Sequence, residues 1–96
     1  MEIKVQSIKF DADQKLLDYI EKKVSKVEKF YDGVGDCEVS LSLLPDPENK
    51  NVQIRVAIPG SEVFVEKNAD TFETAITECV GILKEKLVSV KEKRFK

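Results

Sequence analysis

Residues 52–65 read VQIRVAIPGSEVFV, two alternating segments joined by one short turn. Apolar side chains occupy every second position on both sides of the turn, which predicts two half-buried antiparallel strands. Pro59 followed by Gly60 supplies the backbone angles that a tight turn needs. This hairpin therefore predicts the centre of a β-sheet with one apolar face.

Two more segments extend the predicted sheet. Residues 37–43 (CEVSLSL) alternate apolar with polar side chains, and residues 2–7 (EIKVQS) show the same alternation. Residues 45–49, with two prolines, are expected to form a loop before the hairpin. The sequence therefore predicts four strands.

Two segments have helical periodicity. In residues 15–30, apolar side chains recur at helical spacing after Asp13, a plausible N-cap, and residues 32–35 (DGVG) end the helix with turn residues. A second helix is expected from about Asp70 into the low nineties, with Asp70 as N-cap and Glu73 three residues later.

The predicted element order is β-α-β-β-β-α within a single domain, residues 1–96. The first helix connects two strands that we expect to be parallel neighbours, and the later connections are hairpins. Both helices need an apolar surface to cover, and one face of the sheet supplies it. The predicted fold is an α/β (α+β) two-layer sandwich, with a four-stranded mixed sheet and both helices on one face.

Composition argues against most catalytic chemistry. The chain has no histidine, its two cysteines cannot form a four-cysteine zinc site, and its four glycines do not form a phosphate-binding loop. We therefore expect no enzyme activity, no cofactor, no metal and no small-molecule substrate. No apolar run reaches 18 residues and no leader is recognisable, so we expect a cytoplasmic protein without membrane contact.

Positive charge is concentrated in two short segments, although the net charge is −2. Residues 30–83 contain ten acidic and three basic residues. Residues 22–29 contain four lysines and one acid, and residues 84–96 contain six basic residues and two acids. This asymmetry predicts a local basic surface that the net charge conceals.

The lysines form rows on both predicted helices. At about 100° per residue, the first helix places four of them on one stripe: Lys15, Lys22, Lys26 and Lys29. The second helix carries two rows, Lys84 with Lys91 and Lys86 with Lys93. One interpretation is a solvated helix surface. The other is a polyanion-binding surface, which is an equal alternative here because the acids are segregated from the lysines on neighbouring helices. Lysine rows contact phosphates without reading bases, so structured RNA fits better than DNA.

Four segments carry a family resemblance. Residues 17–32 (LDYIEKKVSKVEKFYD), 58–60 (IPG), 69–76 (ADTFETAI) and 91–93 (KEK) resemble, in their order and spacing, the ribosome hibernation-promoting factor and protein Y family. The resemblance implies a fold like a double-stranded RNA-binding domain with an extra first strand. It also implies the short form of the family, without the second domain of its longer members.

The resemblance further implies a bacterial translation inhibitor of stress or stationary phase. Such factors bind 16S rRNA of the small (30S) subunit within the 70S ribosome, occupy the mRNA and tRNA channel, and promote hibernation, in some cases beside another hibernation factor. The resemblance implies that the residues at matching positions contact rRNA: Lys22, Lys23, Lys26, Lys29, Lys84, Lys86, Lys91, Lys93 and Arg94. Lys15 joins them from the stripe geometry alone. The alternative function is a non-ribosomal protein–protein interaction module.

Overall fold

The computed structural model describes residues 2–8, 10–31, 33–45 and 49–94, and its element order is the predicted β-α-β-β-β-α. The predicted turn residue Asp32 and residues 46–48 of the predicted loop lie outside the described residues.

Four strands form one mixed sheet in the order β1-β2-β3-β4. Their bounds are β1 (Ile3–Ser7), β2 (Cys37–Leu43), β3 (Lys50–Ile58) and β4 (Ser61–Ala69). β1 is parallel to β2, whereas β2, β3 and β4 pair antiparallel. The sheet therefore has two edges, the five-residue β1 and the nine-residue β4.

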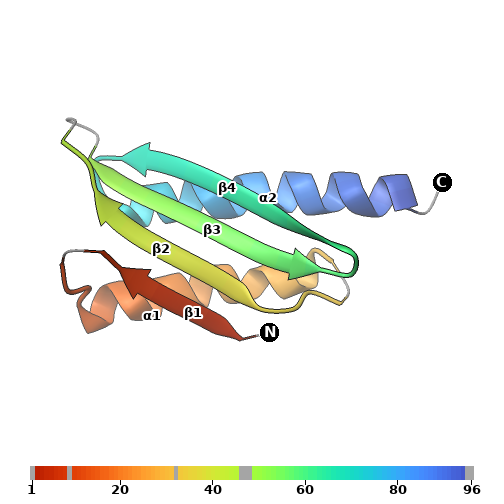
Figure 1. Cartoon of the computed structure of the whole chain (residues 1–96), viewed down its shortest axis with the longest axis horizontal. Helices are drawn as coiled ribbons and strands as arrows, with labels where there is room; N and C mark the ends of the chain where they lie inside the picture. Colours follow the sequence, from red (N-terminus) through yellow and green to blue (C-terminus); the bar gives the residue numbers. More distant parts are fainter. Residues whose placement is uncertain (1, 9, 32, 46–48, 95–96) are drawn as a thin grey trace.

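Both helices cover the same face of this sheet, as predicted (Figure 1). They are α1 (Gln14–Val24), which continues into the 3₁₀ helix η1 (Ser25–Lys29), and α2 (Phe72–Arg94). α1 and α2 contact each other and run in the same direction behind the strands. None of the helices in the described part of the chain is both long and apolar enough to cross a membrane.

The core lies between the sheet and the helices because each strand turns alternate side chains inward. β2 contributes Cys37, Val39 and Leu41 to this core, and α2, which packs on β3 and β4, contributes side chains including Ile76 and Leu83. The opposite face of the sheet is open and mostly polar. Asn51 is buried there, because its side-chain amide donates to Glu66 at 3.0 Å and accepts from Ser42 at 3.1 Å.

Side chains cap the N-termini of both helices. Asp13 caps α1 as predicted, since its carboxylate accepts from the Leu16 N–H at 2.8 Å. The prediction that Asp70 caps α2 is wrong. The helix begins at Phe72, so Thr71 is the residue whose hydroxyl reaches the Thr74 N–H, at 3.1 Å.

The first helix is not α-helical as far as residue 30, which corrects the prediction. Its α-helical part ends at Val24, and η1 follows. Apolar spacing gives the physical reason. Leu16, Ile20 and Val24 are four residues apart, whereas Val24, Val27 and Phe30 are three apart. About 3.0 residues per turn keeps the second set facing the core, and Val27 is fully buried.

Candidate nucleic-acid interface

Two side-chain contacts show which flanks of the helices face each other. The hydroxyl of Tyr19 on α1 lies 2.8 Å from that of Thr77 on α2. Further along, the ammonium of Lys84 on α2 lies 5.6 Å from the ring centroid of Phe30, just after η1. The Tyr19 flank of α1 and the Thr77 flank of α2 therefore face each other along the line where the two helices meet, which we call the groove between the helices.

The lysines of α1 lie on this flank or on the adjoining solvent-facing side of the helix, which we call its crest. Lys23 is half-buried, with its ammonium 5.6 Å from the ring centroid of Tyr19. Lys15 and Lys22 are exposed, and at about 100° per residue they lie within about 60° of Tyr19. α1 therefore directs three ammonium groups toward the groove or its outer rim.

The 3₁₀ geometry of η1 turns two more lysines toward α2. A regular α-helix would place Lys26 and Lys29 at about +20° and −40° from Lys15. With about 120° per residue after Val24, both instead lie at about +50°, one above the other, on the Tyr19 flank. The 3₁₀ geometry therefore brings Lys26 and Lys29 closer to the Tyr19 flank than a regular α-helix would.

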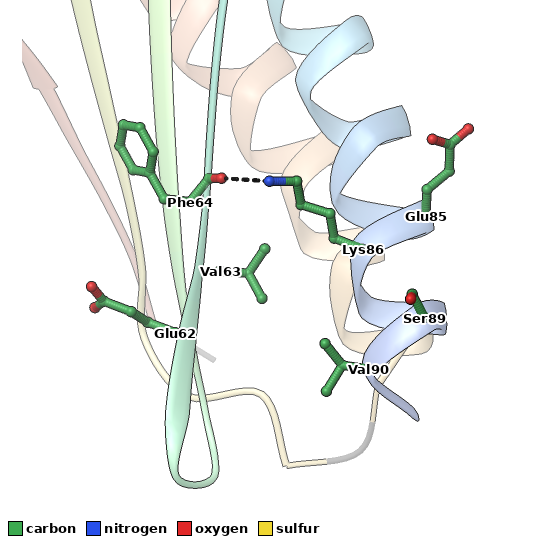
Figure 2. A pocket seen from close by; sticks show the side chains of 7 residues that line it. All are labelled: Glu62, Val63, Phe64, Glu85, Lys86, Ser89 and Val90. Atoms are coloured by element: carbon green, nitrogen blue, oxygen red, sulfur yellow. Dashed lines mark hydrogen bonds between the residues drawn. The ribbon is translucent and has the colours of Figure 1, made fainter. Parts of the chain in front are cut away.

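The lysines of α2 divide between its two flanks. Lys84 and Lys91 lie within about 40° of Thr77, on the side facing α1. Lys86 and Lys93 lie on the opposite flank, where the Lys86 ammonium donates to the Phe64 carbonyl of β4 at 3.3 Å (Figure 2). The structure therefore does not bring Lys86 and Lys93 to the groove.

Of the predicted rRNA-contacting residues, seven lie along the groove and its crest. We call this set the interhelix basic surface: Lys15, Lys22, Lys23, Lys26, Lys29, Lys84 and Lys91. Arg94 is the last residue of α2, and its side chain lies outside the described residues.

Acidic side chains border this surface on both sides. Asp18 and Glu21 lie on the far flank of α1, while Glu78, Glu85 and Glu92 form a row along the outer side of α2. Like-charged ammonium groups gathered between acidic rows suit a polyanion, whose phosphates relieve their mutual repulsion. Lysine ammonium groups in such an arrangement suit phosphates and do not read base sequence.

Three positioning residues were not identified from the sequence. Tyr19 and Phe30 place aromatic faces under Lys23 and Lys84, and Thr77 joins the two helices. The four-residue spacing of Tyr19 and Lys23 on one helix was a usable signal for the first pair. The second pair depends on how the helices pack, which no local pattern reveals.

The cysteines pack in the core. Burial raises the pKa of both Cys37 and Cys79 to about 12, so neither is a thiolate at neutral pH. The Cys79 thiol donates to the Val52 carbonyl at 3.7 Å. Within the described ranges, no three side chains from cysteine, aspartate and glutamate are grouped to hold a metal ion.

Two solved structures with this fold are similar to the chain, one of them a ribosomal subunit interface protein. The N-terminal domain of Protein Y from Thermus thermophilus is 28% identical, with a TM-score of 0.81 and full coverage of both chains. A ribosomal subunit interface protein from Coxiella burnetii shares the fold at 20% identity, with a TM-score of 0.86, over 96% of this chain and 99% of that one.

Sequence comparison agrees with this class. A ribosome hibernation promoting factor from Azotobacter vinelandii is 22% identical over 95 residues, covering 99% of this chain and 87% of that protein. The family model of the sigma 54 modulation protein / S30EA ribosomal protein matches residues 3–94, and the chain belongs to this family. The family resemblance and the predicted fold class are thus confirmed.

Proposed function

We propose that this protein binds 16S rRNA of the small (30S) ribosomal subunit through the interhelix basic surface. One observation carries the proposal. Three helical elements, α1, η1 and α2, direct lysines to one groove, and aromatic rings lie beside two of these lysines. Spaced ammonium groups on a rigid support suit the phosphates of folded RNA, recognised by shape rather than by base sequence.

The proposed action is occupancy without catalysis. A bound protein of this size in the mRNA and tRNA channel of the 30S subunit, alone or within the 70S ribosome, would exclude both RNAs. Excluding these RNAs would silence translation in the cytoplasm during stress or stationary phase. Another hibernation factor would be a further partner. Family membership supports this role, and so does the hibernation promoting factor among its relatives.

Co-sedimentation with purified ribosomes tests the proposal. We expect the protein to pellet with 30S subunits and 70S ribosomes, to saturate near one copy per ribosome, and to be displaced by mRNA with initiator tRNA. A cell-free translation titration should show inhibition in proportion to the ribosomes occupied. Protein that stays in the supernatant at low salt, or complete inhibition far below the ribosome concentration, would contradict the proposal.

A further inference from the structure

β4 is an edge strand, and among the described residues no strand pairs with its outer side. The Phe64 carbonyl points away from β3, because it accepts from Lys86 of α2. In an antiparallel strand the N–H and C=O of one residue point the same way, and this direction alternates along the strand. Glu62, Phe64, Glu66 and Asn68 therefore all direct their backbone groups to the edge, where an added strand could pair with them.

A hollow lies beside this edge, between β4 and the C-terminal half of α2. It has a volume of about 420 Å³. Val63 of β4 and Val90 of α2 point toward each other across it, and the Lys86 side chain crosses it to reach the strand (Figure 2). The hollow is thus apolar at its base and open at the strand edge, a shape suited to aliphatic side chains.

The outer side of the same edge carries two carboxylates, one of which, Glu62, also pairs with Arg55 of β3 at 3.8 Å. Glu62 and Glu66 flank the exposed ring of Phe64 on the open face of the sheet. Hydrogen bonds from Asn51 and Gln53 hold the pKa of Glu66 below its usual value, so it is charged at neutral pH. Cations placed opposite these three side chains would form two ion pairs and one cation–π contact.

We propose that the β4 edge and the hollow beside it bind an extended segment of a partner protein in which basic and aliphatic residues alternate. Its backbone pairs with residues 62–68. Its basic side chains lie over Glu62, Phe64 and Glu66, and an aliphatic side chain enters between Val63 and Val90. This mode is strand addition, in which backbone pairing gives affinity and alternate side chains give specificity.

When the site is empty, the Lys86 side chain occupies the strand edge. Its ammonium satisfies the Phe64 carbonyl at 3.3 Å, a long hydrogen bond that the N–H of an added strand can replace at shorter distance. A second copy of this chain fits poorly. Symmetric antiparallel pairing centred on Phe64 sets Glu62 against Glu66 of the other copy, and like charges directly opposite each other are destabilising.

The site lies on the opposite flank of α2 from the interhelix basic surface, so a segment bound there leaves that surface free. The inference therefore stands apart from rRNA binding, and the failure of either leaves the other intact. It also gives Lys86 a role at the strand edge rather than on RNA.

A capped heptapeptide alternating lysine with valine is the probe, titrated into ¹⁵N-labelled protein. We expect saturable shifts of the amide signals of residues 62–68 and of Val90. The same peptide with every backbone nitrogen methylated, which cannot donate from either edge, should not bind, and neither should a glutamate–valine peptide. Lys86→Gln should bind the probe more tightly, because the competing ammonium is gone.

Charge reversal provides the matched control. Glu62→Lys/Glu66→Lys should weaken binding about tenfold or more and admit the glutamate–valine peptide. Glu21→Lys/Glu78→Lys, which makes the same charge change away from β4, should bind the probe normally. Equal binding of the N-methylated peptide, shifts confined to α1 and η1, absence of any shift, or self-association of the protein through β4 would each overturn the proposal.

Discussion

Lys23 and Lys84 are each held over a single aromatic ring, and this fixes where their charges lie. Both ammonium groups lie 5.6 Å from a ring centroid, within the distance at which a cation is attracted to an aromatic face. A lysine that is already oriented loses less side-chain entropy when it meets a phosphate. Tyr19 and Phe30 are therefore positioning residues of the basic surface as well as packing residues.

The caps of the two helices give a prediction about stability. Asp13→Ala and Thr71→Ala should each lower the free energy of unfolding by about 0.5–2 kcal/mol, since each removes the acceptor of a backbone N–H at a helix start. Asp70→Ala, the matched control for Thr71, should have a much smaller effect. Urea denaturation measures all three. A larger loss of unfolding free energy for Asp70→Ala than for Thr71→Ala would show that Asp70 caps α2.

Glu66 gives a prediction about acid stability. Hydrogen bonds from Asn51 and Gln53 lower its pKa in the folded protein from the usual 4.5. Its carboxylate therefore stabilises the fold above pH 4.5, and this contribution is lost as pH falls through the lower, folded-state pKa. Glu66→Gln should lose less stability than the parent protein between pH 5 and about pH 3. Parallel urea midpoints of the two proteins would refute this linkage.

Most elements could be predicted locally because their signals are local. Alternation predicted β2, β3 and β4, and Asp13 predicted the start of α1. The change to η1 was also present in the sequence, in the three-residue spacing of Val24, Val27 and Phe30, but a single 3.6-residue period does not detect it. The cap of α2 was misassigned because Asp70 and Thr71 are both good caps and only backbone geometry chooses between them.

Two glycines give opposite predictions. Gly81 lies in the middle of α2, and a Cβ there would have no neighbour within 4 Å, so Gly81→Ala should stabilise the protein by about 0.5–1 kcal/mol through helix propensity. Gly33 has φ +85° and a Cβ there would lie 3.2 Å from Pro59, so Gly33→Ala should destabilise by about 1–2 kcal/mol. Thermal melts decide both. Destabilisation by Gly81→Ala would show that α2 needs glycine at this position.

The molecule has two sides of different chemistry. Lysines gather where α1, η1 and α2 meet, whereas the open face and β4 edge of the sheet carry polar groups and the carboxylates of Glu62 and Glu66. This separation of positive from negative charge explains how a chain of net charge −2 can present a basic surface. Local charge, rather than the sum, decides where a polyanion binds.

The sequence predicted the lysine rows but not their division. Helical angles separated Lys84 and Lys91 from Lys86 and Lys93, yet only the packing of α1 against α2 shows which pair faces the groove. That choice depends on contacts between residues 58 positions apart, Tyr19 and Thr77. Sequence periodicity alone does not specify such a contact.

Charge reversal within the groove tests whether the interhelix basic surface binds the 30S subunit. The variant Lys26→Glu/Lys29→Glu/Lys84→Glu removes cations contributed by η1 and α2, and Lys4→Glu/Lys50→Glu/Lys67→Glu makes the same charge change on the strands. Surface changes of this kind alter stability by about 0.5 kcal/mol or less each, and thermal melts of both variants verify folding.

The measurement is co-sedimentation of both variants with 30S subunits across a salt series. The groove variant should bind far more weakly than the strand variant. The slope of its log affinity against log salt should become shallower by about 2–3, because each lost phosphate contact contributes about 0.7–0.9 to the magnitude of that slope. A folded groove variant that binds 30S subunits as tightly as the strand variant would rule out rRNA binding by this surface, and would leave the lysine rows as a solvated helix surface.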